Sequence, residues 1–350
     1  MTHLVRLLFL VLLVLAVVVV VGLLVVRVGR EALERRRRRR LKSLRSVILT
    51  ALMGEPDEAA RARSDLRSRS EADWGDVEEQ ALAMIPKIKG DSHDELISLL
   101  LSRGATGRAG SLARSRSQVR RARGAYRLGT LAQRDSLSPL FALLRDRAFL
   151  VRRMAVRALG QVGDPLAVEP LLDAVTADNR LTRDVLAAIG RIGPDAGAPL
   201  RRELRNDLDT ADPGRRAALT AMGLGLLADL SAVPLLVEAL ADRTRPGLAQ
   251  AAAEALGSVG APESVASLLD AVTADDPAVR AAAARALGQV GDVRAATGLA
   301  EALTHRHHES SRAVAGALLR LGAPGLAALD RSDSPYAAEA LAVHRVRAGA

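Results

Sequence analysis

Three histidines near the C-terminal end are the residues best suited to metal chemistry. His305, His307 and His308 form the one imidazole cluster in the 350 residues, and Glu309 follows them directly. Neutral imidazoles bind transition metals, but no HExxH pattern accompanies this cluster. We interpret the cluster as an exposed turn, and we expect no metal ligand, no cofactor and no catalytic residue in the chain.

The composition excludes several further chemistries. The chain has no cysteine, which excludes a thiol nucleophile, a disulfide framework, a Cys-ligated zinc site and an iron–sulfur cluster. Aromatic residues make up only 2% of it, which leaves little surface for stacking nucleic-acid bases. No phosphate-binding GxxxxGKS or GxxxxGKT motif and no GxSxG motif occurs. These absences favour a binding protein over an enzyme.

The net charge of +10 is concentrated in the first third of the chain. Residues 1–130 hold 25 Lys and Arg against 14 Asp and Glu, whereas residues 131–350 hold 25 against 26. A nucleic-acid-binding surface would make the long second part basic. We therefore do not expect nucleic acid as a partner, and binding through the basic first third is the weakest of three functional hypotheses.

A membrane-spanning helix is predicted near the N-terminus. Leu7 to Val26 is a run of 20 residues with no polar side chain. At about 1.5 Å of rise per residue this run spans roughly 30 Å, the thickness of the hydrocarbon core of a bilayer. The run is longer than the apolar core of a cleaved signal peptide, and no small-residue cleavage site follows it. We predict an uncleaved anchor, with residues 1–6 outside the cytoplasm.

A run of arginines follows the predicted span. Residues 27–45 contain ten Lys and Arg against two Glu. The positive-inside rule places this heavier basic flank in the cytoplasm, so we expect a single-pass protein of the inner membrane with the rest of the chain in the cytoplasm. The candidate contacts with anionic lipid headgroups are six consecutive side chains: Arg35, Arg36, Arg37, Arg38, Arg39 and Arg40.

Three segments are predicted between the membrane end and the repeats. Residues 27–53 have apolar residues at helical spacing and form a basic juxtamembrane helix. Residues 54–75 are charged and rich in small residues, which is typical of a linker or of a poorly packed helix. Residues 76–110 form a helical lead-in, because Asp76 opens a capping box with the glutamate three residues later. We expect Trp74 to pack as the hydrophobic staple of this lead-in.

A second basic cluster lies just before the repeats. Arg108 to Arg127 carries seven Arg and no acidic residue. The pattern is typical of a solvated helix face, and the alternative is a second contact with anionic headgroups or with an acidic partner.

The remaining sequence repeats itself with a nearly fixed period. Segments such as VRALGQVGDPLAVEPLLDAV and ARALGQVGDVRAATGLAEAL recur, and one glycine marks each of them. The marking glycines are Gly129, Gly160, Gly190, Gly223, Gly257 and Gly288, and a seventh unit has Leu319 in this place. Spacings of 30 to 34 residues indicate stacked structural repeats.

Each repeat is predicted to form two helices. Apolar residues at three- and four-residue spacing occupy the first helix, as in Val151, Ala155 and Leu159. A short turn containing Gly and Asp ends this helix, and a Leu-rich second helix follows. We therefore predict an all-α fold, a right-handed α-solenoid of about seven helix pairs over residues 111–331. One transmembrane helix precedes it, and a capping helix or tail over residues 332–350 follows.

These repeats resemble a known family. The segments ALGQVGDPLAVEPLLDAV and DPAVRAAAARALGQVGD resemble bacterial HEAT repeats of the PBS-lyase HEAT-like type, here behind an N-terminal membrane anchor. The resemblance implies that an arginine eight residues before the glycine braces neighbouring repeats. It assigns this structural role to Arg121, Arg152, Arg215 and Arg280. Two units depart from the pattern, with Thr182 and Ala249 in this place.

The resemblance also points to a surface for partners. In this family the second helix usually lines the concave side of the superhelix. Acidic residues recur on it about thirteen residues after the glycine, with other charged residues at neighbouring positions in the third and fourth units. The candidate partner-binding stripe is Asp173, Arg202, Glu238, Asp270 and Glu301, and the competing interpretation of these residues is a solvated helix face.

Three functions follow from these features. The leading hypothesis is a membrane-tethered scaffold or regulatory subunit that binds a protein at the cytoplasmic face, such as a membrane protein or a membrane-associated enzyme. The alternative is a bilin-lyase-like or metal-dependent HEAT-repeat enzyme. Deoxyhypusine hydroxylases of this repeat class hold iron through several His-Glu dyads, whereas this chain has only His308-Glu309. The third hypothesis is nucleic-acid binding through the basic first third.

Overall fold

The predicted membrane anchor lies outside the described part of the computed structural model. The model describes Arg27 and residues 43–210, 215–303 and 308–348. Residues 7–26 and Arg35 to Arg40 are therefore not among the described residues. Within the described ranges, no helix has both the length and the apolar character needed to cross a bilayer.

The first of two compact units, Met1–Ala105, is helical where the sequence indicated a linker or a poorly packed helix. A helix over residues 43–53 is followed by α2 (Pro56–Ser68), α3 (Glu71–Met84), the short turn Ile85–Lys87 and α4 (Asp91–Ser102). Of the two interpretations of residues 54–75, a linker or a poorly packed helix, the structure has helix. Its many charged residues face solvent along α2, while Ala59 and Leu66 are buried. Two buried positions in a charged segment give too weak a periodic signal to recognise a helix.

Helix α3 begins five residues before the predicted restart at Asp76. Ser70 is its N-cap, and the Ser70 hydroxyl accepts a hydrogen bond from the Asp73 backbone N–H at 3.3 Å. Trp74 therefore lies inside the helix instead of ahead of it as a staple. Its side chain is almost fully buried, and the Arg103 guanidinium lies 4.6 Å from its ring centroid.

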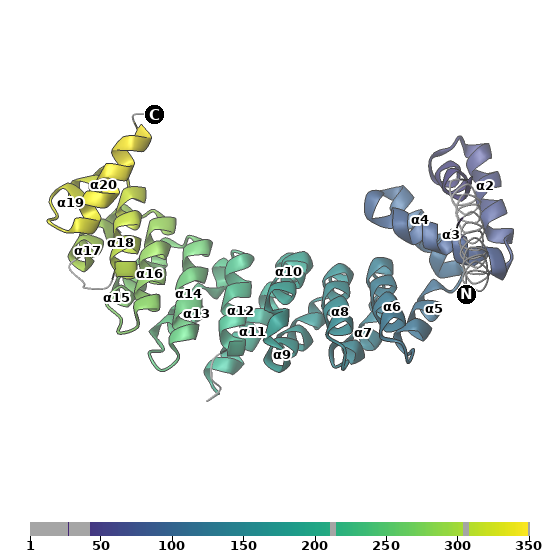
Figure 1. Cartoon of the computed structure of the whole chain (residues 1–350), viewed down its shortest axis with the longest axis horizontal. Coiled ribbons are helices and arrows are strands. Elements are labelled where there is room, and N and C mark those ends of the chain that lie inside the picture. The colour runs from purple at the N-terminus through teal and green to yellow at the C-terminus, as the bar shows by residue number, and fades with distance from the viewer. Residues whose placement is uncertain (1–26, 28–42, 211–214, 304–307, 349–350) are drawn as a thin grey trace, which may run out of the picture. The chain divides into compact units, whose positions relative to one another are not determined.

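The second unit, Thr106–Ala350, consists of helix pairs that follow one another along the chain (Figure 1). The first helices are α6 (Gln118–Leu131), α8 (Phe149–Val162), α10 (Thr182–Ile192), α12 (Arg215–Leu226), α14 (Pro246–Val259), α16 (Pro277–Val290) and α18 (His308–Arg320). The second helices are α7 (Leu137–Leu144), α9 (Val168–Ala177), α11 (Gly197–Leu208), α13 (Val233–Ala241), α15 (Val265–Ala271), α17 (Ala296–Ala302) and α19 (Ala323–Asp330). Helix α5 (Ala105–Ala113) precedes the pairs, and α20 (Pro335–Ala348) follows them.

The all-α prediction is confirmed for the described residues, which contain no strand. The seven pairs of helices match the repeats read from the sequence, and α20 lies in the segment predicted as a capping helix or tail. The right-handed sense of the solenoid stays a prediction. Because each pair contacts mainly its neighbours, the array is stabilised through the interfaces between successive pairs.

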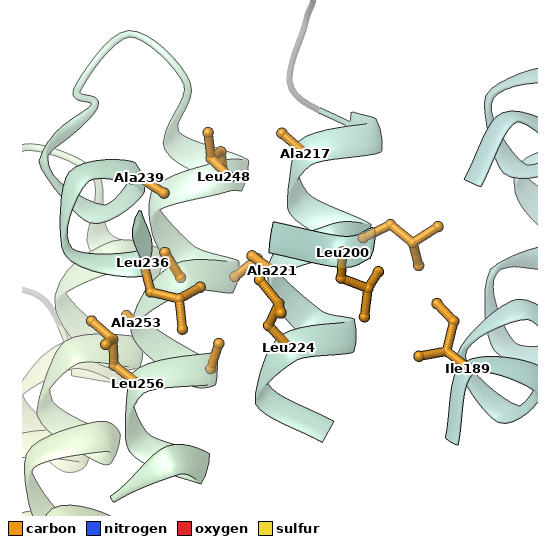
Figure 2. Close-up of a cluster of buried hydrophobic side chains, with 14 of the residues drawn as sticks. Ile189, Leu200, Ala217, Ala221, Leu224, Leu236, Ala239, Leu248, Ala253 and Leu256 are labelled. Atoms are coloured by element: carbon orange, nitrogen blue, oxygen red, sulfur yellow. The ribbon is translucent and has the colours of Figure 1, made fainter. Parts of the chain in front are cut away.

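One continuous hydrophobic core runs through the second unit. Leu224 of α12, Leu236 of α13 and Leu256 of α14 are fully buried, and Figure 2 shows them in the interior that these helices share. Burying a leucine side chain stabilises a fold by roughly 1.5–3 kcal/mol, so these residues hold adjacent pairs together.

Two of the repeat glycines, Gly129 and Gly160, let successive first helices approach to backbone contact. A Cβ on Gly129 would lie 2.6 Å from the Ala158 Cα, and one on Gly160 would lie 2.7 Å from the Ala188 Cα. These separations are shorter than any van der Waals contact, so only glycine fits at the two positions. The small residue is therefore required by the packing of one repeat on the next.

The fourth unit is marked by Gly225 and not by Gly223. A Cβ on Gly225 would lie 2.6 Å from the Ala255 Cα, whereas one on Gly223 would meet only side chains, the nearest at 3.3 Å. Ala228, three residues after Gly225, has a φ of 50°, in the left-handed region that the helix-ending glycines of other units also adopt. The predicted position of Gly223 is thus wrong by two residues, because AMGLGLL offers two candidate glycines.

Candidate functional site

Arginines near the start of the first helices connect successive repeats. The Arg121 Nη1 atom donates to two backbone carbonyls of the loop before α6, at 3.1 and 2.9 Å. Its Nε and Nη2 atoms bind the carboxylate of Asp146, in the loop before α8, at 2.6 and 2.9 Å. Arg152 makes the same two kinds of contact, and its Nη2 lies 2.5 Å from Asp178 in the next loop.

These contacts keep the loop carboxylates ionised. Hydrogen bonds from Arg180 and then from Arg152 hold the pKa of Asp178 well below its usual range. The hydrogen bonds from Arg121 lower the pKa of Asp146 in the same way. At neutral pH both aspartates therefore act as fixed negative partners for the arginines.

Arg280 makes only the first of the two contacts. Its Nη1 donates to two backbone carbonyls of the loop before α16, at 2.6 and 2.8 Å. Its Nε and Nη2 atoms are buried, and no described residue accepts a hydrogen bond from them. The sequence contains no carboxylate at residues 304–307, in the connection to α18.

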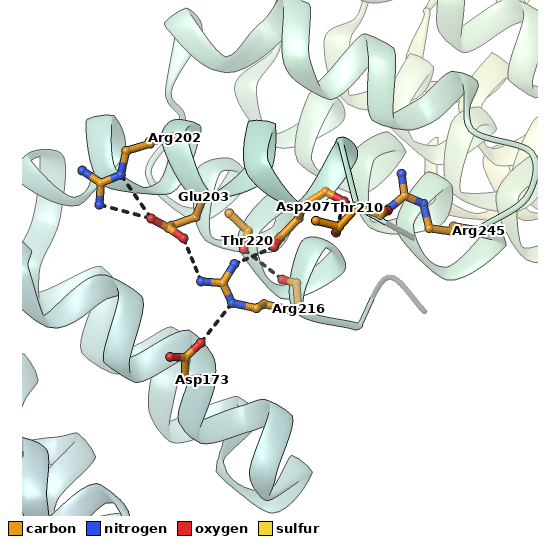
Figure 3. Close-up of polar contacts among 8 residues, drawn as sticks. All are labelled: Asp173, Arg202, Glu203, Asp207, Thr210, Arg216, Thr220 and Arg245. Atoms are coloured by element: carbon orange, nitrogen blue, oxygen red, sulfur yellow. Dashed lines mark hydrogen bonds and ion pairs between the residues drawn. The ribbon is translucent and has the colours of Figure 1, made fainter. Parts of the chain in front are cut away.

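In the fourth unit the arginine that connects repeats is Arg216, while the predicted Arg215 is exposed. Figure 3 shows Arg216 between carboxylates of two earlier repeats. Its guanidinium lies 2.8 Å from Glu203 and 2.6 Å from Asp207, both on α11, and 3.2 Å from Asp173 on α9. Burial lowers the pKa of Arg216, but the two α11 carboxylates outweigh this effect and raise it above its usual value. Sequence alone did not distinguish the two adjacent arginines.

The candidate stripe residues lie on successive second helices. Asp173 is on α9, Arg202 on α11, Glu238 on α13, Asp270 on α15 and Glu301 on α17. Grooves open between the second helices of this layer, whereas Gly129 and Gly160 bring the first helices α6, α8 and α10 to backbone contact.

Counting thirteen residues from the glycine places an acidic residue in the third and fourth units as well. Counted from Gly190, the residue in register with Asp173 is Glu203, and Arg202 is its neighbour. Glu203 is buried and accepts hydrogen bonds from Arg202 at 3.1 and 3.2 Å. Counted from Gly225, Glu238 is in register without any shift.

The stripe residues differ in how far their charges are already paired within the array. Asp173 pairs with Arg216, so part of its charge is used inside the array. Asp270 lies 3.5 Å from Arg243, and both side chains are more than half exposed. Glu238 is exposed as well. A partner would therefore meet mainly the carboxylates of Glu238 and Asp270.

Three grooves between second helices each include one stripe carboxylate. The α7–α9 groove has a volume of about 830 Å³ and includes Asp173. The α13–α15 groove, of about 710 Å³, includes Asp270, and the α17–α19 groove, of about 860 Å³, includes Glu301. Leu, Val and Ala side chains line the α13–α15 and α17–α19 grooves beside the charged residues. An apolar floor with a charged rim is suited to holding a segment of another protein.

The second basic cluster is not a uniform solvated face. Arg121 is buried in its ion pair with Asp146. The exposed members are Arg114, Arg116, Arg120 and Arg123. The expectation of an exposed helix face therefore applies to only part of the cluster.

The histidine cluster is described only at His308, because His305 and His307 lie outside the described residues. The His308 Nδ1 atom lies 3.1 Å from the Tyr336 hydroxyl oxygen, and the two rings meet edge to face. In the described ranges no three His, Cys, Asp or Glu side chains are grouped so that they could hold a metal ion.

Comparison with known proteins identifies the repeats. The family model for HEAT repeats matches residues 110–190, 197–276 and 245–320, which is more than half of the chain. No curated protein sequence matches the chain.

Several solved structures match the chain at low sequence identity. The complex of CpcE and CpcF of phycocyanin lyase from Nostoc sp. PCC7120 matches at 22% identity and a TM-score of 0.33, over 67% of this chain and 92% of that chain. Human deoxyhypusine hydroxylase in complex with glycerol matches at 20% identity and a TM-score of 0.32, over 70% and 97%. YibA of Escherichia coli matches at 17% identity and a TM-score of 0.37, over 77% and 96%.

Proposed function

The chain belongs to the HEAT-repeat family, and from this we propose that it is a membrane-tethered interaction scaffold or regulatory subunit whose array binds a protein partner. The observation that carries the proposal is the row of grooves along the second-helix layer, each with a stripe carboxylate. Grooves of this size accept side chains of a partner, and a row of them offers an extended contact.

The tether is part of the proposal. It is supported by the 20-residue apolar run at residues 7–26 and by the basic flank that includes Arg35 to Arg40. In this arrangement the N-terminus is outside, the arginines contact anionic headgroups, and the array is in the cytoplasm at the inner membrane.

Reporter fusions test the arrangement in the membrane. Alkaline phosphatase is active only after export, so its fusion after residue 350 should be inactive. A reporter that requires the cytoplasm should be active at the same position. The opposite pattern would show that the array is on the other side of the membrane.

Partner recovery tests the scaffold role. The tagged full chain is purified from membranes after crosslinking, beside a variant with Asp270→Lys and Glu301→Lys. We expect the variant to lose the proteins recovered with the unmodified chain, because like charges would then face one another across the contact. The matched control reverses Asp195 and Glu263, two exposed residues in turns between first and second helices. Equal recovery with both variants would reject the second-helix layer as the binding surface.

A further inference from the structure

The α13–α15 groove lacks an arginine that the matching α7–α9 groove contains. Ala249 stands eight residues before Gly257, the place that Arg152 takes before Gly160. Both residues line their respective grooves. The difference leaves the position of Ala249 in the α13–α15 groove without a guanidinium group and without the methylene stem that carries it.

The carboxylate that such an arginine would meet is still present. Asp178, eighteen residues after Gly160, pairs with Arg152 at 2.5 Å. Asp275 stands eighteen residues after Gly257, is exposed and lines the α13–α15 groove. None of the described residues forms an ion pair or a hydrogen bond with its carboxylate. The two grooves thus share a carboxylate, and only one of them contains the cation that neutralises it.

The excess of negative charge extends over the rim of the groove. Four aspartates and one arginine line it. Asp276 uses its carboxylate to cap α16, accepting two backbone N–H groups at 2.8 and 3.2 Å. Asp270 and Arg243 are 3.5 Å apart and well exposed, and pairs of this kind contribute little. The carboxylates of Asp270 and Asp275 therefore remain open to a cation from outside.

The floor of the groove suits the aliphatic part of a long side chain. Leu240, Ala249 and Ala271 are buried apolar residues that line it, and Val237 adds a half-buried one. Long basic side chains place their methylene groups on such surfaces while the charged end reaches a carboxylate. A planar guanidinium binds a carboxylate through two hydrogen bonds, whereas an ammonium acts as a point charge.

We propose that the α13–α15 groove binds an arginine side chain of a protein partner. Its guanidinium occupies the space beside Ala249 and pairs with Asp275, in the same way that Arg152 pairs with Asp178 in the α7–α9 groove. Its stem lies on the apolar floor, and Asp270 attracts the charge from the rim. This inference rests on the proposed scaffold function and specifies which partner residue the array recognises.

A set of three labelled pentapeptides tests the proposal directly. They share leucines on both sides of a central residue, which is arginine, lysine or citrulline, the neutral isostere of arginine. Binding to the purified full chain is followed by fluorescence anisotropy. Since a hydrogen bond to a charged group contributes about 1.5–3 kcal/mol, we expect the arginine peptide to bind at least ~10-fold more tightly than the citrulline peptide. Equal binding of these two peptides overturns the proposal.

Variants locate the contact. Asp275→Asn should weaken the arginine peptide to the level of the citrulline peptide, whereas Asp195→Asn removes an equal charge outside the groove and should change nothing. The new side chain in Ala249→Arg should occupy the place of the partner's arginine and pair with Asp275, which abolishes the preference for the arginine peptide. Undiminished binding of the arginine peptide by Ala249→Arg would also overturn the proposal.

Thermal melting gives a readout that needs no ligand. Ala249→Arg should melt at a higher temperature than Ala249→Met, which has a similar length and no charge. The difference should vanish when Asp275→Asn is added, because the internal guanidinium then has no carboxylate. A difference that survives Asp275→Asn contradicts the proposed pairing.

The groove proposal and the scaffold proposal can fail separately. If the peptides are not discriminated but Asp270→Lys with Glu301→Lys still loses its partner, the scaffold stands and the arginine site is rejected. If the arginine preference holds but partner recovery is unchanged, the site stands and the scaffold surface is rejected.

Discussion

Arg121 and Asp146, which stand in successive repeats, are joined by two parallel hydrogen bonds. The Arg121 Nε lies 2.6 Å from Oδ2 and the Nη2 lies 2.9 Å from Oδ1 of Asp146. Both side chains are about nine-tenths buried. Since the stability of a solenoid is close to a sum of repeat and interface terms, this contact acts directly on one interface.

The Arg121–Asp146 pair predicts a loss of stability in acid. The folded-state pKa of Asp146 is below its value in the unfolded chain, which is about 4. The stabilisation is therefore present above about pH 4 and is lost as pH falls through the lower folded-state pKa. We expect Asp146→Asn to melt at a lower temperature than the unmodified chain at pH 7, and the gap to narrow below pH 4. Melting curves from pH 7 to pH 2 measure the gap, and a gap that does not change with pH would contradict this interpretation.

The glycine contacts predict opposite results for the same substitution at two sites. Gly160→Ala places a Cβ 2.7 Å from the Ala188 Cα, and overpacking of this kind costs roughly 1–3 kcal/mol. A Cβ on Gly190 meets only the Leu226 side chain, at 3.3 Å, which can rotate away. Gly190→Ala should therefore be neutral or stabilise by up to about 1 kcal/mol through helix propensity. Chemical unfolding measures the free energy of unfolding of both variants. Equal destabilisation would show that the close backbone contact between α8 and α10 does not require glycine.

The sequence predicted the positions of the helix pairs, but it misplaced the glycine at which α12 contacts α14. Apolar spacing in segments such as 149–162 is strong, so the first and second helices were predicted where they lie. The marking glycine of the fourth unit was predicted wrongly, because Gly223 and Gly225 satisfy the period almost equally. Only the backbone contact with Ala255 distinguishes them. The sequence did not decide between a linker and a helix over residues 54–75, because only two of the residues in α2 are buried.

The sequence predicted which residue types form the candidate site, but not which of its carboxylates are already paired within the array. Ala249 could be recognised from the sequence as a departure from the arginine pattern. That Asp275 lines the same groove, and that no described residue neutralises it, follows only from the fold. Likewise, the sequence placed Asp173 on an exposed stripe, but its pairing with Arg216 joins residues 43 positions apart.

Two alanines in left-handed turns predict a stabilising substitution. Ala132 and Ala228 both have φ of 50°, where the turns after α8, α14 and α16 have Gly163, Gly260 and Gly291. A residue with a Cβ is disfavoured in this conformation by about 1 kcal/mol, while glycine is not. We expect Ala228→Gly to stabilise the array by about 0.5–1 kcal/mol and the reverse change, Gly163→Ala, to destabilise it by a similar amount. Urea unfolding measures both, and a loss of stability in Ala228→Gly would contradict the argument.

Charge reversal along the acidic stripe should have unequal effects on stability. Asp173 contacts Arg216, whose side chain is only 14% exposed, so Asp173→Lys brings two cations together at a partly buried site. We expect a loss of about 1 kcal/mol, which lowers the melting temperature of a domain of this size by roughly 2–4 °C. Asp270→Lys acts on a side chain that is 79% exposed and should change stability by less than about 0.5 kcal/mol.

Salt dependence separates this electrostatic explanation from a packing effect. Raising the ionic strength from 0.01 M to 1 M shortens the Debye length from about 30 Å to about 3 Å, which weakens repulsion between partly exposed charges. The melting temperature of Asp173→Lys should therefore approach that of Asp173→Asn as salt is added, since the neutral variant removes the pair without adding a cation. If Asp173→Lys and Asp173→Asn melt together at every salt concentration, the loss comes from the missing pair with Arg216 alone. If Asp270→Lys is the more damaging change, the Asp270 carboxylate is occupied within the array and is not open to a partner.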